Sequence, residues 1–104
     1  MAYVRINMFD FKSTEVLRKT ADDMHRTLKS GYPEVRVFIG MEASETSLVG
    51  IVVYDDKEAA DRAVEKRDKH TAGEGYKDNF SHEGNIIAFY AENEQIDNLV
   101  KSVS

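Results

Sequence analysis

The chain has 104 residues, of which 41% are hydrophobic and 32% charged, and it carries a formal net charge of −5 at pH 7. This length and composition predict one water-soluble globular domain over residues 1–104, with no stretch long and apolar enough to cross a membrane. The acidic balance and the interleaving of cations with carboxylates argue against a nucleic-acid partner. Without cysteine or an N-terminal secretory pattern, the chain fits a cytoplasmic protein that has no disulfides and no thiolate metal site.

An alternating pattern at about residues 2–11 predicts the first strand. The alternation divides its side chains between two faces: Val4, Ile6 and Met8 on one, and Tyr3, Arg5, Asn7 and Phe9 on the other. The second set mixes aromatic with polar groups, so the two faces of this strand differ in kind.

A helix is predicted after Ser13, which is a suitable N-cap, and Gly31 is expected to end it. Its inward face carries apolar residues at helical spacing: Leu17, Ala21, Met24 and Leu28. A second alternating strand at 34–43 and a third strand at 48–54 follow. The polar linker between these two strands is short enough for a hairpin, so they should pair antiparallel.

The third strand leads directly into a second helix. Asp55 can accept a hydrogen bond from the backbone N–H of Glu58 and so cap the first turn of this helix. The helix then presents a narrow face of mostly small residues, which can lie close against a sheet: Ala59, Ala60, Ala63, Val64 and Arg67.

Glycine-rich sequence ends the second helix, and the polar stretch 76–84 is interpreted as a loop. The fourth strand is expected at about 85–91, where apolar residues alternate between two faces: Ile86, Ala88 and Tyr90 against Ile87 and Phe89. The tail at 94–103 has an apolar stripe at helical spacing, which predicts a C-terminal helix that packs on another apolar surface: Ile96, Leu99, Val100 and Val103.

The order β-α-β-β-α-β plus a terminal helix predicts an α+β fold of the ferredoxin-like type, with both central helices on one face of a four-stranded antiparallel sheet. We expect the aliphatic sets, represented by Ile6, Ile39 and Ile51, to face the helices. The opposite face, with Phe9 and Phe38, is too apolar to leave in water. A second copy of the chain is the simplest cover for it, so a homodimer is expected.

Residues 3–7, the hairpin and above all residues 52–60 (VVYDDKEAA) resemble the antibiotic-biosynthesis-monooxygenase-like proteins of the dimeric α+β barrel superfamily. The similarity covers about residues 2–91. It implies that two sheets pair in a dimeric barrel and that each subunit has a pocket between helices and sheet. Members include cofactor-independent oxygenases, haem-degrading enzymes and muconolactone isomerase-like enzymes, so the fold alone does not select a reaction.

In the haem-degrading branch, the site combines an asparagine on the first strand, a tryptophan on the second helix and a histidine near the end of that helix. Asn7 matches the asparagine. The tryptophan position falls on Ala63, and the histidine position falls near Gly73, three residues after His70. These departures argue against haem degradation, and no cofactor is implied. Asn7 is then either a hydrogen-bonded strand residue or a ligand contact.

The three histidines have no metal-ligand spacing, so the sequence predicts no metal site. His70 and His82 flank the glycine-rich connection after the second helix. Either could act as a general base near neutral pH if it reached a pocket, and the alternative is that both are exposed loop residues. Asn7, His70 and His82 are therefore the candidate catalytic residues.

The mixed face of the sheet supplies the candidate ligand pocket: Arg5, Asn7, Phe9, Arg36, Phe38 and Tyr54. Two guanidinium groups on a covered face indicate either ion pairs at a dimer seam, with Glu34 or Glu42, or a pocket for an anionic or phenolic molecule. Two functions follow from these alternatives. One is cofactor-independent oxygenation or isomerisation of a small organic molecule, and the other is a non-enzymatic ligand-binding or assembly module.

Overall fold

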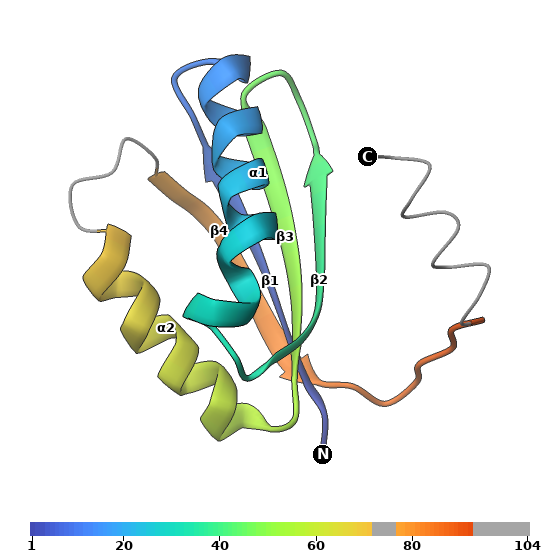
Figure 1. Cartoon of the computed structure of the whole chain (residues 1–104). Helices are drawn as coiled ribbons and strands as arrows, with labels where there is room; N and C mark the ends of the chain where they lie inside the picture. The colour runs from blue at the N-terminus through green and yellow to red at the C-terminus, as the bar shows by residue number, and fades with distance from the viewer. Residues whose placement is uncertain (72–76, 93–104) are drawn as a thin grey trace.

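The computed structural model describes the backbone of residues 1–71 and 77–92, and the side chains of residues 1–67 and 81–92. These ranges form four strands and two helices: β1 Tyr3–Asp10, α1 Thr14–Gly31, β2 Val35–Glu42, β3 Ser47–Tyr54, α2 Lys57–Thr71 and β4 Lys77–Asn85. Figure 1 shows both helices on the same face of one sheet. Neither of these two described helices is long and apolar enough to cross a membrane.

The sheet is antiparallel throughout, and its strand order is β2-β3-β1-β4. β1 therefore lies inside the sheet, whereas β2 and β4 are its edges. β2 and β3 form the expected hairpin, in which Ala43 N donates to Ser47 O at 2.9 Å. The prediction of a ferredoxin-like α+β fold is confirmed.

The position predicted for the fourth strand, 85–91, is wrong. β4 instead covers most of the stretch that was interpreted as a loop, and it pairs antiparallel with the whole of β1. Polar residues are tolerated in β4 because it is an edge strand, and its backbone hydrogen bonds to β1 do not require an apolar alternation. A search for alternation alone therefore misses this strand.

Residues 86–92, which we call the arm, continue beyond the sheet because β1 begins at Tyr3. Tyr3 pairs with Asn85, and Ile86 N then donates to Ala2 O at 2.8 Å. Figure 1 shows the arm extending past the start of β2 and away from both helices. The helix predicted at 94–103 lies outside the described residues.

The prediction of which sheet face meets the helices is also wrong. In β1 the buried residues lie beneath the helices, and they are the mixed set: Tyr3, Arg5, Asn7 and Phe9. The aliphatic residues of β1 are partly exposed on the other face. Strand register extends this second face across the sheet, since Ile6 pairs with Ile51 and Ile51 with Ile39. We call it the open face.

The mixed face packs against the helices because α2 presents small side chains and a backbone hydrogen-bond acceptor to it. The alanines of α2 leave room for the rings of Tyr3 and Tyr54. The backbone of α2 also accepts a hydrogen bond from the guanidinium of Arg5, through Ala60 O at 2.7 Å. A buried arginine is tolerated where its N–H groups have hydrogen-bond acceptors. The polar residues of the mixed face therefore did not show that this face was the exposed one.

The helix caps agree with the sequence at α1 and differ by one residue at α2. Ser13 caps α1 as predicted, because its Oγ accepts a hydrogen bond from Val16 N at 3.2 Å. In α2 the cap is Asp56 rather than the predicted Asp55, since Asp56 Oδ1 accepts from Ala59 N at 2.8 Å. The prediction that a carboxylate begins this helix was right, but its position was not.

Candidate functional site

Two separate core clusters lie beneath the helices. Under α2, Tyr3 and Tyr54 pack against its alanine face. Under the start of α1, the cluster contains larger apolar side chains: Phe9, Phe11, Leu17 and Leu48. Because α1 is anchored mainly through Leu17, near its N-terminal end, its later turns lie less closely on the sheet. Space therefore remains between the two clusters.

A cavity of about 620 Å³ occupies this space, between α1, α2 and the sheet. Its volume falls in the range of sites for small organic molecules. Residues from both clusters bound it, including Tyr54 and Phe9, and β1 also contributes Arg5 and Asn7. Aromatic and charged groups therefore meet in one partly open cavity.

Two glycines, one in β2 and one in β3, leave space on the helix-covered face of the sheet. Gly40 and Gly50 are cross-strand partners on the helix-covered face, and the ring of Phe38 lies against both. A Cβ on Gly40 would lie 3.4 Å from Phe38 Cε2, and a Cβ on Gly50 would lie 3.7 Å from Phe38 Cε1. The ring thus forms an aromatic wall of the cavity where two side chains would otherwise stand.

Tyr54 presents a phenol group to the cavity. The residue is only 5% exposed, and none of the described residues forms a hydrogen bond with its hydroxyl. Every fully enclosed side-chain nitrogen or oxygen in the described part of the chain has a partner, so this hydroxyl must meet the open volume of the cavity. Burial raises the pKa of Tyr54, and the positive charges of Arg5 and Arg67 oppose that shift. At neutral pH the group is a neutral phenol that can donate to a ligand.

Asn7 and Arg67 form a charged wall of the same cavity. In the amide orientation that gives both the oxygen and the nitrogen of Asn7 hydrogen-bond partners, the oxygen accepts from Arg67 Nη1 at 2.5 Å. Its nitrogen then donates to Ile6 O at 3.0 Å and to Ser81 Oγ at 3.2 Å. The guanidinium carbon of Arg67 also lies 5.7 Å from the centroid of the Phe9 ring. Asn7 and Phe9 therefore hold a cation beside the cavity.

Arg5 is buried and fastens α2 to the sheet. Its Nε donates to Glu83 Oε2 at 2.5 Å, its Nη1 donates to Ala60 O at 2.7 Å, and its Nη2 forms ion pairs with Glu83 and Asp61. These contacts link β1, β4 and α2 through one side chain. Its charge also reaches the cavity, because it helps to stabilise the ionised form of Tyr54.

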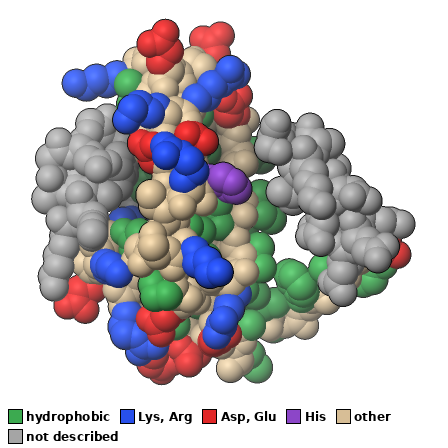
Figure 2. All heavy atoms as spheres, viewed as in Figure 1, with side chains coloured by type: hydrophobic (Ala, Val, Ile, Leu, Met, Phe, Trp, Pro, Cys, Tyr) green, Lys and Arg blue, Asp and Glu red, His purple; other side chains and the backbone are tan. Residues whose placement is uncertain are grey.

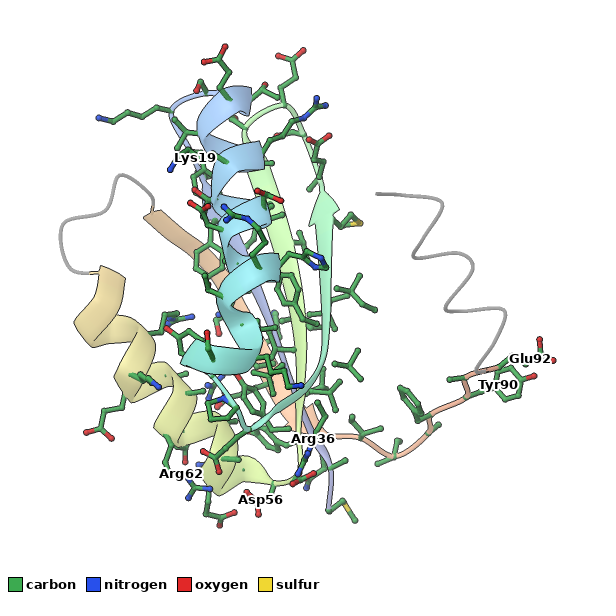
Figure 3. All side chains as sticks on the ribbon, in the orientation of Figure 1. Lys19, Arg36, Asp56, Arg62, Tyr90 and Glu92 are labelled. Carbon is green, nitrogen blue, oxygen red and sulfur yellow. The ribbon has the colours of Figure 1, made fainter. Side chains whose placement is uncertain are left out.

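Arg36, the remaining arginine of the predicted pocket, does not reach the cavity. A register shift between Val35 and Val37 interrupts the alternation of β2, and the Arg36 side chain is exposed. It donates to both oxygens of Asp55, at 3.0 and 2.7 Å, and thereby lowers the pKa of that carboxyl. Figure 3 shows Arg36 at the lower end of the sheet, below α1. The other five predicted pocket residues all line the cavity.

The carboxylates suggested as ion-pair partners at a dimer seam have partners within the chain. Arg62 donates to Glu34 at 2.9 and 2.6 Å, and Arg18 donates to Glu42 at 2.7 Å. These hydrogen bonds lower the pKa of Glu34 and of Glu42. Neither carboxylate is therefore bound to Arg5 or Arg36 in this structure.

The histidine candidates are not brought into the described site. His82 pairs with Ile6 and so belongs to the open face, whereas the adjacent Ser81 pairs with Asn7 on the covered face. The side chain of His70 lies outside the described side chains. Among the described residues, no histidine lines the cavity, and no group of three or more histidines and carboxylates is placed to hold a metal ion.

Arg67 is a charged cavity residue that the sequence interpretation did not assign to the pocket. It lies four residues after Ala63, and residues at this spacing share a helix face. The sequence therefore contained a pattern that places the Arg67 side chain on the same face of the helix as Ala63. Thr20 and Met24 of α1 line the cavity too, and they also lie on its inward side. Periodicity predicts the direction of these side chains, but it does not reveal an unfilled volume beneath them.

Among known proteins, no family model and no curated sequence matches this chain. Solved structures do share its fold. A dimeric ferredoxin-like protein from an uncultured marine organism is 16% identical, with 88% of this chain and 100% of that chain covered and a TM-score of 0.64.

Two further structures concern oxygenases. SnoaB from Streptomyces nogalater, a cofactor-independent oxygenase, is 13% identical, with 88% of this chain and 98% of that chain covered and a TM-score of 0.60. A candidate antibiotic biosynthesis monooxygenase from Chloroflexus aurantiacus is 12% identical, with the same coverage and a TM-score of 0.60. The resemblance inferred from the sequence is confirmed at the level of the fold.

Proposed function

We propose that this chain forms a homodimer in which each subunit binds an aromatic small molecule and oxygenates it without a cofactor. The ligand carries an ionisable hydroxyl group, such as a phenol or an enol. The observation that carries this proposal is the hydroxyl of the almost fully buried Tyr54, which opens on the cavity and has no partner among the described residues. A ligand oxygen in the cavity could accept a hydrogen bond from this hydroxyl.

The cavity walls match such a ligand in shape and charge. The rings of Phe9 and Phe38 offer apolar faces for an aromatic ring system. Arg67 and the buried Arg5 place positive charge nearby, which favours the deprotonated form of a bound hydroxyl. Tyr54 can donate to the resulting oxyanion. The site therefore favours the deprotonated, anionic form of the ligand.

Oxygenation without a cofactor requires the substrate to supply the electrons. An anion stabilised in the cavity is electron-rich and can react with O2 at an activated CH2 carbon. One oxygen atom then forms a new carbonyl on that carbon, and the other leaves as water with the two hydrogens of the carbon. The balance needs no external reductant, because the two C–H bonds provide the electrons.

Ligand binding without turnover is the second candidate function. The ion pairs of Asp23 favour it, because they occupy the carboxylate that could otherwise act as a base. Asp23 is a cavity carboxylate, but it pairs with Lys19 at 3.3 Å and with Arg26 at 2.5 Å. Among the described residues that line the cavity, neither an imidazole nor an unpaired carboxylate is available as a general base. A substrate acidic enough to ionise on binding would be needed for turnover.

Binding is tested with naphthol and with methylnaphthalene, which keeps the rings but has no oxygen. We expect naphthol to bind more tightly by calorimetry, and Tyr54→Phe to weaken naphthol binding about tenfold while leaving methylnaphthalene unchanged. Tyr90→Phe is the matched control, because it removes the same hydroxyl from an exposed position outside the cavity. Equal binding of the two probes, or no effect of Tyr54→Phe, would contradict the proposal.

Turnover is tested with a hydroxyanthrone, which combines phenolic hydroxyls with an activated CH2 group. The oxygenase function predicts O2 consumption above the rate without protein and a lower rate with Tyr54→Phe. Binding without O2 consumption would instead support the second candidate.

A further inference from the structure

We propose that Gly50 determines the length of the ligand that the cavity accepts. This inference rests on the proposed function, which places the ionisable hydroxyl of the ligand at Tyr54. It adds a residue that selects among such ligands, because a side chain at position 50 would occupy the space that the far end of a longer ligand needs.

One face of β3 forms part of the cavity floor. Tyr54, Val52 and Gly50 all line the cavity, and alternate residues of a strand share one face of the sheet. A rise of about 3.3 Å per residue puts the Cα atoms of Tyr54 and Gly50 about 13 Å apart. A ligand that is held at the Tyr54 hydroxyl and extends along β3 must therefore pass Val52 before it reaches Gly50.

The cavity extends along β3, beneath α1. Tyr54 is the last residue of β3, whereas Phe11, which also lines the cavity, donates its backbone N–H to Thr46 O just before the strand begins. Apolar residues of α1, such as Met24, line the cavity, and Figure 2 shows charged side chains of both signs on the outer side of this helix. A ligand anchored at Tyr54 therefore lies between α1 and β3, and a longer ligand reaches further toward the start of β3.

The neighbours of Gly50 across the sheet are held in place, so they do not fill the space above it. Asn7 is its partner on β1, and the Asn7 amide oxygen accepts a hydrogen bond from Arg67. On the β2 side, the ring of Phe38 lies against Gly40 as well as Gly50. The backbone of Gly50 is therefore open to a ligand between an amide and an aromatic ring.

A methyl group at position 50 would enter the cavity without displacing the protein. Among the described residues, only Phe38 has an atom within 4 Å of a Cβ at this position, and Cε1 lies at an ordinary contact distance of 3.7 Å. Glycine weakens a strand interior, so alanine at position 50 should retain the fold. The added methyl group should therefore affect the ligand rather than the packing of the sheet.

The test compares three probes that share a hydroxyl group and differ in length: phenol, naphthol and anthrol. Their dissociation constants for the full chain are measured by equilibrium dialysis. We expect wild-type affinity to rise with each added ring, because more apolar surface leaves water. Gly50→Ala should leave phenol binding unchanged and weaken anthrol binding about tenfold or more, because its methyl group occupies the space of the third ring.

Gly40→Ala is the matched control. It adds the same methyl group to the same face of the neighbouring strand, but Gly40 is not among the described residues that line the cavity. A Cβ on Gly40 would lie 3.4 Å from the Phe38 ring and 3.7 Å from Leu48 Cδ1, so its methyl group packs within the protein. We expect this variant to bind all three probes as the wild-type protein does. Unchanged phenol binding by Gly50→Ala shows in turn that its cavity is intact.

Two results would overturn the inference: anthrol binding that Gly50→Ala does not weaken, or an equal loss of affinity for all three probes. If Tyr54→Phe still weakens naphthol binding in that case, the proposed function stands and only the role of Gly50 fails. If Tyr54→Phe changes the binding of no probe, the ligand is not anchored at Tyr54, and both the proposed function and the role of Gly50 fail.

Discussion

The two faces of this sheet show that polarity alone does not tell which surface is covered. The helix-covered face buries a guanidinium and an amide, and both have partners: Arg5 with Ala60 O, and Asn7 with Arg67. The open face carries aliphatic residues such as Ile6 and Ile51 that are partly exposed. A polar group can be buried when the fold supplies its hydrogen-bond partners, whereas an apolar surface forms no hydrogen bonds with water and is more stable when covered.

Together with the proposed homodimer, this difference gives the two faces separate expected roles. Changes on the covered face should affect folding and ligand binding within one chain. Changes on the open face should affect the association of two chains, because a continuous apolar sheet face is stable in water only when covered.

The largest expected effect comes from placing a charge on the open face. Ile51→Asp should convert the proposed homodimer to a monomer at micromolar concentration, because association would bury an unpaired carboxylate. Sedimentation velocity measures the result. Val16→Asp is the matched control, since it places the same charge on an exposed apolar residue of α1 and should remain dimeric. A dimeric Ile51→Asp protein would show that association uses another surface.

The next effect separates folding from association. Leu17→Ala should lower the free energy of unfolding by about 3 kcal/mol, because Leu17 is fully buried in the cluster under α1. Ile39→Ala, on the open face, should change it by less than about 0.5 kcal/mol. Both are compared by urea unfolding in the monomeric Ile51→Asp background, so that association does not contribute. Similar losses for the two variants would mean that the faces do not differ as described.

The third-largest expected effect is a difference in stability between variants of a buried and an exposed arginine. Arg5→Met should lower the free energy of unfolding by about 2 kcal/mol, because it leaves Ala60 O and the nearby carboxylates without their buried donor. Arg36→Met removes an exposed ion pair and should leave the urea midpoint almost unchanged. Equal effects would indicate that Arg5 does not fasten α2.

The smallest expected effect is on the acid sensitivity of the exposed ion pairs. Hydrogen bonds from arginines hold the pKa values of Glu34, Glu42 and Asp55 below their ordinary range. A lowered folded-state pKa gives stability that is present above the unfolded-state pKa, about 4, and is lost as the pH falls through the folded-state value. Urea midpoints should fall between pH 6 and pH 3, and less so for Arg36→Met. An identical pH dependence in both proteins would exclude a contribution from Asp55.

Much of the fold could be predicted because local signals determine it. Alternation in β1, the cap at Ser13 and the short linker of the hairpin each act within a few residues, and each is found as expected. β4 could not be predicted in this way, because its pairing with β1 is a long-range contact made by polar sequence. The arm has the better strand pattern but lies beyond the end of its potential partner.

The candidate site was partly predictable for a similar reason. Alternation groups Arg5, Asn7 and Phe9 on one face of β1, and register brings Tyr54 to that face. The local irregularity at Arg36 and the unfilled space above Gly50 depend on how strands and helices pack, which periodicity does not describe. Sequence therefore predicts which residues share a face, and packing decides which of them meet a cavity.

The most direct test of these separate roles is native mass spectrometry of the wild-type protein and Ile51→Asp, each with added naphthol. We predict a wild-type dimer that carries two naphthol molecules and an Ile51→Asp monomer that carries one, because each cavity is built by a single chain. A wild-type monomer, or an Ile51→Asp monomer that no longer binds naphthol, would contradict the account.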